Sequence, residues 1–325
     1  MATIKFMGRN YTFSKFVETV SQVLYYEFLV PISTIPSRVI FGNFLGYKDN
    51  ILPLLRITFN KLLRIGDVRE DSRLQEVATQ LHEMGYVNIR AAPQTRTGGL
   101  SVPDMKTIVA KYNHFIVENG SALAGLGGKI LYINKPLEKI PEFAELVTPE
   151  IDHIVRAYYA SDYRIKSVRA WRNYHVPHTD SQKDVGLSNA FHNDGLPRTD
   201  LRLFVLLCDG VTRDTGATRF HDKPNSRKLA LDPGYFSRRW QTARVKRRLL
   251  DSNSIKFFEG NIGDSCLINT QECIHASSIP SPGTFRDIVA FEIIPTNRQT
   301  KLEQIFSEMP EDDQINSKLM AYKSE

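Results

Sequence analysis

The feature that most constrains the fold is the pattern after about residue 160, where short β-branched and aromatic runs alternate with Gly, Pro, Asp and Asn. Runs this short are not typical of helices, and turn residues between them are typical of a β-sandwich or barrel. The predicted strands are Val168–Val176, Leu201–Cys208, Ala217–Phe220, Ser254–Phe258, Ser265–Ile268 and Asp287–Ile294. We therefore expect a mainly β core in this part of the chain.

The front of the chain follows a helical period instead. Apolar residues recur at spacings of three and four over 13–29 and 51–65, which predicts two amphipathic helices. Two more helices are expected over 72–83 and 103–118, with a short strand at Tyr86–Ile89 between them. The first two helices either pack on the main domain or present a basic face to a membrane or a partner. We divide the chain into a helical extension (1–72), a β-rich domain (73–300) and a C-terminal helix or tail (301–325).

Composition excludes several classes of protein. The 42 basic and 36 acidic residues leave a net charge of +6, which permits an anionic substrate, a membrane surface or nucleic acid without selecting one. Three cysteines at no metal-like spacing exclude a disulfide scaffold and a zinc ribbon, so we expect a reducing, cytoplasmic setting. The most apolar stretch, 16–35, is interrupted by charged residues and a proline and is not expected to span a membrane. The run Gly125–Lys129 lacks the spacing of a phosphate-binding loop and predicts a turn.

Four residues carry a chemical signal. His192 and Asp194 are two apart, so on an extended chain their side chains point to the same side. His275 follows a predicted strand over 263–269, and Arg286 begins the next predicted strand. Two histidines and one carboxylate leave open positions on a metal, as in non-haem Fe(II) oxygenases, and Arg286 would offer a planar cation to the far carboxylate of a 2-oxo acid. The alternative is that the four are unrelated residues of turns and surface.

Over residues 75–295 the sequence resembles the phytanoyl-CoA dioxygenase group of Fe(II)/2-oxoglutarate-dependent oxygenases. The matching segments are Gln80–Ile89, the His192-x-Asp194 pair, Asp209–Gly216 followed by Ala217–Lys228, and His275-Ala-Ser277 with Arg286. The resemblance implies a double-stranded β-helix, a jelly-roll or cupin-like core with helical elaboration. It also implies that His192, Asp194 and His275 bind Fe(II), while Arg286 and Ser277 hold 2-oxoglutarate. The sequence departs from the group at Phe191 and over 223–227, and residues 1–72 have no counterpart in it.

The resemblance implies an enzyme that uses 2-oxoglutarate and O2 as cosubstrates to oxidise an unactivated C–H bond of a small molecule. Hydroxylation is the expected outcome, because Asp194 is present where the related halogenases have Gly or Ala. Oxidative cyclisation or desaturation of a biosynthetic intermediate stays open, since both begin with the same hydrogen abstraction. An alternative of another class is a non-catalytic β-helix protein that binds a membrane or a partner.

Outside these four residues, one strand face, three histidines and two cysteines are further candidates for the site. Arg169, Trp171 and Asn173 alternate along a predicted strand and share one face. This face either lines the pocket, with Asn173 near the 2-oxoglutarate, or forms a polar outer surface. Three other histidines are expected in loops or on the surface rather than as ligands: His175, His178 and His221. Cys266 and Cys273 are expected to pack as small hydrophobic residues.

A basic run lies between Arg238 and Arg248. Its members are Arg238, Arg239, Arg244, Lys246, Arg247 and Arg248. The run is either a solvated helix face or an anion-binding lid over the active site, since recognition commonly lies on loops of a rigid scaffold. On the second interpretation a small anionic substrate is expected. Nucleic acid is not an expected partner, because aromatic residues are not interleaved with the charges and no known binding motif is present.

Overall fold

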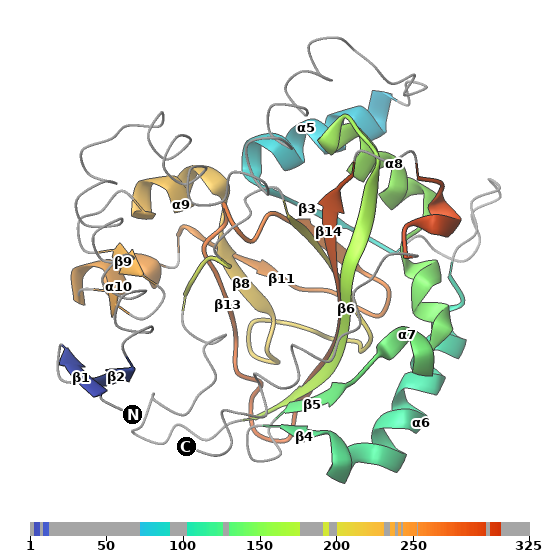
Figure 1. Cartoon of the computed structure of the whole chain (residues 1–325), viewed down its shortest axis with the longest axis horizontal. Coiled ribbons are helices and arrows are strands. Elements are labelled where there is room, and N and C mark those ends of the chain that lie inside the picture. Colours follow the sequence, from blue (N-terminus) through green and yellow to red (C-terminus); the bar gives the residue numbers. More distant parts are fainter. Residues whose placement is uncertain are drawn as a thin grey trace.

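The computed structural model describes residues 3–6, 9–12, 72–91, 103–125, 130–175, 191–194, 200–230, 235–237, 240–241, 243–251, 253–296 and 300–306 (Figure 1). The helices predicted over 13–29 and 51–65 lie outside these residues, as does most of 301–325. The division into extension, β-rich domain and tail therefore stays a prediction. Near the N-terminus, β1 (Thr3–Phe6) and β2 (Arg9–Thr12) pair as an antiparallel hairpin.

The larger sheet of the core has seven strands, and all of its pairings are antiparallel. In order across the sheet they are β3 (Tyr86–Ile89), β12 (Ser265–Ile268), β7 (Leu201–Leu206), β14 (Phe285–Pro295), β6 (Tyr163–Tyr174), β5 (Ile130–Ile133) and β4 (Ala124–Gly125). Strand β14 is buried over most of its length, which explains its continuous run of Ile, Val and Phe.

The smaller sheet lies opposite the larger one. It contains β11 (Ile255–Phe258), β8 (Thr218–His221) and β13 (His275–Ser277), and an antiparallel bridge to His275 adds His192 at its edge. From β6 onward the chain alternates between the two sheets. The large sheet receives β6, β7, β12 and β14, and the segments between them in sequence pair in the small sheet: His192, then β8 and β11, then β13. This double winding of antiparallel strands is a double-stranded β-helix, or jelly roll, and confirms the expected fold class.

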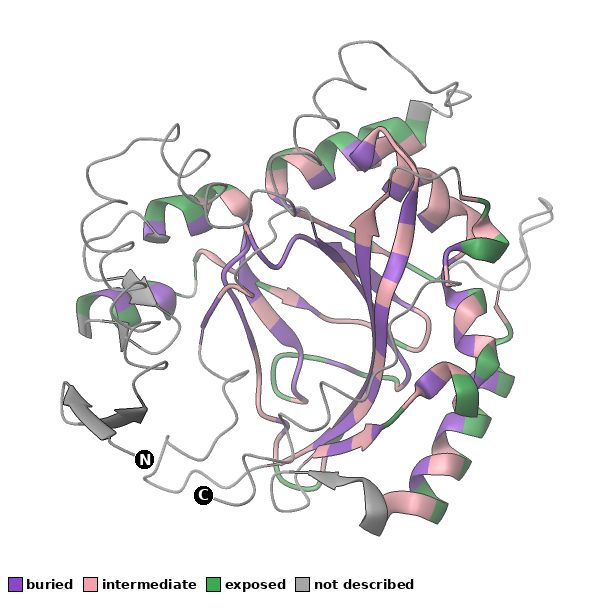
Figure 2. Ribbon diagram, viewed as in Figure 1, coloured by how far each residue is buried: buried purple, intermediate pink, exposed green. Residues whose placement is uncertain are grey.

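The two faces of the large sheet bury different sets of residues. Toward the small sheet, Phe204 and Ile288 of the large sheet form one apolar cluster with Phe220 and Phe258 of the small sheet. The opposite face packs against the helices α5 (Ser72–Met84), α6 (Met105–Leu123) and α8 (Pro149–Tyr159). Figure 2 shows exposed residues along α5 and α6, whereas α8 carries only buried and intermediate residues. Polar side chains that point between the sheets are therefore enclosed by the core.

Helix α8 was not predicted, although its start carries clear signals. Thr148 caps it by accepting a hydrogen bond from the backbone N–H of Ile151 at 3.3 Å, and Pro149 occupies its first turn. It follows α7 (Pro136–Lys139) and a 3-10 turn (Pro141–Leu146). The other described elements are α9 (Lys223–Ala230), β9 (Tyr235–Ser237), β10 (Trp240–Gln241), α10 (Ala243–Leu249) and a 3-10 turn at Leu302–Gln304.

The structure confirms the predicted strands and the two predicted helices that fall on described residues. Boundaries differ most at the strand predicted over 168–176, because β6 begins five residues earlier (168 − 163 = 5), where it pairs with the end of β14. Of the run predicted as a turn at 125–129, residues 126–129 lie outside the described part. Within the described residues, no helix combines the length and the apolar character needed to cross a membrane.

Candidate metal centre

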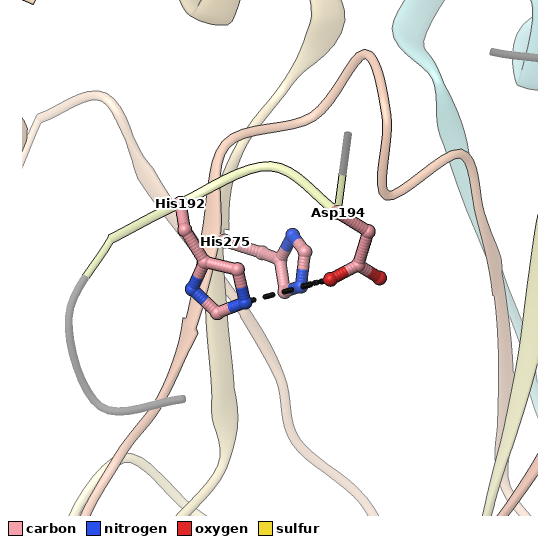
Figure 3. A group of neighbouring side chains, drawn as sticks. All are labelled: His192, Asp194 and His275. Carbon is pink, nitrogen blue, oxygen red and sulfur yellow. Dashed lines mark ion pairs between the residues drawn. The ribbon is translucent and has the colours of Figure 1, made fainter. Parts of the chain in front are cut away.

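Three side chains converge between the two sheets: His192, Asp194 and His275 (Figure 3). One candidate ligand atom from each lies within 4.8 Å of the other two. Asp194 Oδ1 is 3.6 Å from His192 Nε2 and 3.7 Å from His275 Nε2. These separations are longer than hydrogen bonds, and they are short enough for the three atoms to face one metal ion, whose bonds to nitrogen and oxygen are about 2.0–2.2 Å.

The backbone fixes this convergence. His192 and His275 exchange both backbone hydrogen bonds, at 2.9 Å from His192 N to His275 O and 2.8 Å in the other direction. Asp194 is held separately, because its backbone N–H donates to Thr270 O at 3.2 Å. A paired strand segment and an anchored turn therefore present the three side chains to the interior, with His192 and His275 only 3% and 8% exposed.

The protonation states suit metal binding. Burial, together with the neighbouring His192, lowers the pKa of His275 to about 3, so this imidazole is neutral at neutral pH. Its Nδ1 lies 3.1 Å from Cys273 O. A carbonyl oxygen can only accept a hydrogen bond, so the tautomer with Nδ1–H is selected and the lone pair of Nε2 is free to bind a metal. Burial alone would raise the pKa of Asp194, but the neighbouring histidines and Arg202 outweigh it and hold that pKa well below its usual range. The site thus offers neutral imidazole and ionised carboxylate donors.

Arg202 on β7 holds the remaining carboxylate oxygen. Its Nε donates to Asp194 Oδ2 at 2.9 Å, while Oδ1 faces the histidines. Arg202 Nη2 also lies 3.9 Å from Glu292, which accepts a hydrogen bond from Lys166 at 2.8 Å. The sequence analysis did not identify Arg202. The available signal was an arginine inside the otherwise apolar strand 201–206.

We expect Arg202→Met to weaken divalent metal binding by about 10–100-fold, the usual cost of losing a group that orients a metal ligand. The variant loses both the direction of the Asp194 carboxylate and the charge that keeps it ionised. Calorimetric titration with Co(II) measures the change. Arg202→Lys should recover part of the affinity, and Arg247→Met, on an exposed position of α10, should bind Co(II) as the wild type does. Unchanged affinity in Arg202→Met would show that other groups orient Asp194.

Arg286 is a second polar group in the interior and is only 1% exposed. Its Nη1 donates to Gly216 O at 2.7 Å and to Thr218 Oγ1 at 3.0 Å, and its Nη2 donates to Ser277 Oγ at 3.4 Å. Among the described residues, none accepts a hydrogen bond from its Nε, and no carboxylate forms an ion pair with it. Burial lowers the pKa of Arg286 to about 10, so it remains charged at neutral pH. A buried charge without a counter-ion is costly, and an incoming carboxylate would supply one.

Two further residues shape the surroundings of Arg286. The strand register sets Asn173 opposite it. With its amide oxygen turned inward, Asn173 accepts hydrogen bonds from Arg286 Nη2 at 2.5 Å and from Trp171 Nε1 at 3.3 Å. Gly216 has a φ of 102°, and a Cβ there would lie 2.8 Å from Pro280. The turn that presents the Gly216 carbonyl to Arg286 therefore requires glycine.

Strand β13 sets the distance between the metal-binding group and Arg286. His275 and Ser277 are two residues apart on β13, so they point to the same side about 6.6 Å apart. His275 belongs to the metal-ligand group and Ser277 contacts Arg286. A five-carbon dicarboxylate such as 2-oxoglutarate can reach from one group to the other. The donor set and the unmatched guanidinium therefore fit Fe(II) and 2-oxoglutarate.

Among the described residues, none of the remaining candidates joins the metal-binding group. His221 is fully buried on β8, and its Nε2 hydrogen-bonds with Leu249 O at 2.9 Å. The expectation of a loop or surface position was wrong for this histidine, because it occupies a buried strand position. His175 is half-buried and bonds with Pro280 O at 2.8 Å. His178 lies outside the described residues. Cys266 and Cys273 are buried free thiols, as predicted.

The basic run falls partly on α10. Arg244, Lys246, Arg247 and Arg248 are exposed, while Val245 and Leu249 are buried against the outer side of the small sheet. This pattern is that of a solvated helix face. Arg238 and Arg239 lie outside the described residues, so their place relative to the site stays a prediction.

Comparisons with known proteins give structural likeness only. No family model and no curated protein matches the sequence. Among solved structures, the non-heme monooxygenase ThoJ, in its apo form, is 16% identical, with a TM-score of 0.48 over 76% of this chain and 94% of that chain. The carbocyclase SnoK from nogalamycin biosynthesis, a non-heme α-ketoglutarate-dependent protein, is 15% identical, with a TM-score of 0.46 over 68% and 83%.

A third similar structure is EctD from S. alaskensis with 2-oxoglutarate and 5-hydroxyectoine, 12% identical with a TM-score of 0.45 over 69% of this chain and 77% of that chain. At these identities and scores the likeness does not assign an activity. The assignment of the fold rests on the strand order of this chain, and any activity must be argued from its own side chains.

Proposed function

We propose that this protein is an Fe(II)/2-oxoglutarate-dependent oxygenase. The observation that carries the proposal is that strand β13 contributes one residue to the candidate metal site and another to the surroundings of Arg286. His275 joins His192 and Asp194 at one position, and two residues along the same strand Ser277 contacts the buried Arg286. Grouping buried metal-binding side chains close to a buried guanidinium, for which the described residues supply no counter-ion, costs stability, and a scaffold protein has no use for that cost.

The residues have separate tasks. His192, Asp194 and His275 hold the metal on one face, so that other ligands reach its open positions. Arg286 and Ser277 bind the distal carboxylate of 2-oxoglutarate, and the apolar cluster between the sheets excludes water from the site. When bound, iron with 2-oxoglutarate and O2 supplies the oxidising chemistry, in which 2-oxoglutarate becomes succinate and CO2 as one oxygen atom enters the substrate in a hydroxylation.

Hydroxylation of a C–H bond in a small, anionic molecule is the reaction that we favour. Asp194 lies beside His192 and His275 as a candidate third ligand, which supports this outcome over halogenation, where that carboxylate is absent. Membership of the phytanoyl-CoA dioxygenase group is part of the same proposal and rests on the matched sequence segments. Cyclisation or desaturation uses the same site and differs only in the fate of the substrate radical.

The test begins with binding and continues with turnover. Purified protein loaded with Fe(II) without oxygen should bind one equivalent of 2-oxoglutarate, measured by calorimetry, and the metal-free protein should bind it much more weakly. With oxygen admitted, a screen of small organic acids should identify compounds that raise succinate formation and O2 consumption together. Protein that binds no divalent metal, or that binds metal but not 2-oxoglutarate, would contradict the proposal and favour a non-catalytic scaffold.

A further inference from the structure

A third arginine lies on the wall of the same interior. Arg169, Trp171 and Asn173 occupy alternate positions of β6, opposite Ala290, Ile288 and Arg286 of β14. Ile288 and Ala290 belong to the apolar cluster between the two sheets, and Trp171 packs against that cluster. Side chains two apart on a strand share a face. Arg169 therefore faces the interior, so this face of β6 is not an outer surface.

Arg169 lacks the partners that the other interior arginines have. Arg202 is paired with Asp194, and Arg286 is held by several oxygen atoms. Across the described part of the chain, Arg169 forms no hydrogen bond or ion pair, and its Nε is enclosed without an acceptor. The residue as a whole is only half-buried. An arginine that is partly enclosed and unmatched is a ready binding group for an anion.

The strand register places Arg169 between the two ends of the proposed site. Arg202, which contacts Asp194, shares a row of the large sheet with Glu292. Arg169 shares the next row with Ala290, and Asn173 shares a row with Arg286 farther along. Arg169 is thus separated from Arg286 along β14 by four residues (290 − 286 = 4), on the part of the wall nearer to the metal ligands.

The surroundings of Arg169 are aromatic. Trp171 follows on the same face, and its ring lies 6.2 Å from that of Tyr132, which pairs with Trp171 across β5 and β6. Burial raises the pKa of the Tyr132 hydroxyl, and the positive charges of Arg169 and Arg286 oppose that rise. With Arg286 assigned to 2-oxoglutarate, Arg169 supplies the one remaining positive charge beside the two rings. This charge fits a molecule that has one carboxylate and an apolar body better than a phosphate, which carries nearly two negative charges.

We propose that Arg169 binds the carboxylate of the molecule that is oxidised, with the apolar part of that molecule against Trp171 and Tyr132. The inference rests on the proposed function and adds the substrate class: an organic carboxylic acid. It also moves the expected substrate cation from the basic run of α10 to the wall of the pocket. The other carboxylate source is 2-oxoglutarate itself, and the experiment separates the two.

The experiment uses the small number of tryptophans. The chain has two, Trp171 and Trp240, so Trp240→Phe leaves Trp171 as the only tryptophan reporter beside Arg169. In protein loaded with Zn(II) and 2-oxoglutarate, fluorescence quenching by iodide is compared with quenching by neutral acrylamide. We expect Arg169→Gln to lower the ratio of the iodide to the acrylamide quenching constant by at least about twofold, because a cation concentrates anions near it.

Matched variants make the result specific. Arg169→Lys keeps the charge and should retain most of the iodide preference, and it also serves if Arg169→Gln fails to fold. Arg247→Gln removes one exposed charge from α10 and should leave the ratio unchanged. An equal ratio in the parent and in Arg169→Gln overturns the proposal. An effect of the same size in Arg247→Gln also overturns it, because the attraction would then come from the overall charge.

Calorimetry identifies the carboxylate that Arg169 serves. The dissociation constant of 2-oxoglutarate on the Zn(II)-loaded protein should change by less than about twofold in Arg169→Gln, whereas a tenfold rise, a loss of about 1.4 kcal/mol, would assign Arg169 to 2-oxoglutarate and overturn the inference. Failure of 2-oxoglutarate to bind the parent protein contradicts the proposed function instead, while the iodide ratio still reports on Arg169.

Steady-state turnover gives the last test of the proposal. In a screen of carboxylic acids and their primary amides, acids alone should raise succinate formation. For an active acid, Arg169→Gln should raise KM by at least about tenfold, since a hydrogen bond to a charged group is worth about 1.5–3 kcal/mol and tenfold corresponds to about 1.4 kcal/mol. A neutral amide that is oxidised as well as its acid would overturn the assignment.

Discussion

Asp194→Ala is expected to abolish metal-dependent oxidation. The substitution removes the one anionic ligand of the group and leaves Arg202 without its partner at 2.9 Å. A buried cation would then lie beside the metal position with only Glu292, 3.9 Å from its Nη2, to balance it. Co(II) affinity should fall by more than about 100-fold, the upper end of the cost of losing only an outer partner, and succinate formation with Fe(II) should fall to the level without enzyme.

Controls separate loss of the ligand from loss of the fold. Asp214→Ala removes an exposed carboxylate in the turn before β8 and should leave metal affinity unchanged. His275→Ala and His192→Ala should behave like Asp194→Ala, whereas His114→Ala, whose side chain is 72% exposed on α6, should behave like the wild type. Wild-type turnover in any of the three ligand variants, at saturating Fe(II) and 2-oxoglutarate, would contradict the metal assignment.

The β core was predictable because its strands are long enough to carry a pattern. Strands β6, β7 and β14 have runs of β-branched and aromatic residues that only a covered sheet explains, and their positions follow from the sequence. The helices α5 and α6 were predictable because they too are long enough to carry a pattern, in this case the helical one. The three-residue strand β13 gave no such signal, so His275 was expected to follow the strand at 263–269, whereas it lies on a strand of the opposite sheet.

The site was predictable in residue type but not in its supporting contacts. The His192-x-Asp194 pair is local, and a two-residue spacing on extended backbone is enough to predict that both side chains converge. Arg202 lies only eight residues beyond Asp194 (202 − 194 = 8), yet their contact depends on the place of β7 in the large sheet, which no local pattern contains. Sequence patterns also left open which face of β6 points inward. That choice depends on the pairing of β6 with β14, a long-range register that no local pattern contains.

Arg286→Met is expected to lower the affinity for 2-oxoglutarate by at least about tenfold while leaving Co(II) affinity nearly unchanged. The lost contact is a charge-assisted one, worth about 1.5–3 kcal/mol, and the distal carboxylate would be left buried without a partner. The metal ligands are not affected directly, because Arg286 forms its hydrogen bonds with Gly216, Thr218, Ser277 and Asn173.

Thermal unfolding gives a readout that does not depend on turnover. At 100 times the wild-type dissociation constant, 2-oxoglutarate should stabilise the Zn(II)-loaded wild type by about 2.7 kcal/mol, and a variant with tenfold weaker binding by about 1.4 kcal/mol. Arg286→Lys keeps the charge but not the planar pair of donors, so its stabilisation should fall between these values. Equal stabilisation of the wild type and Arg286→Met would mean that another cation holds the carboxylate. Arg169, the other unmatched arginine on the interior wall, would then be the first residue to test, and the substrate carboxylate would need a different partner.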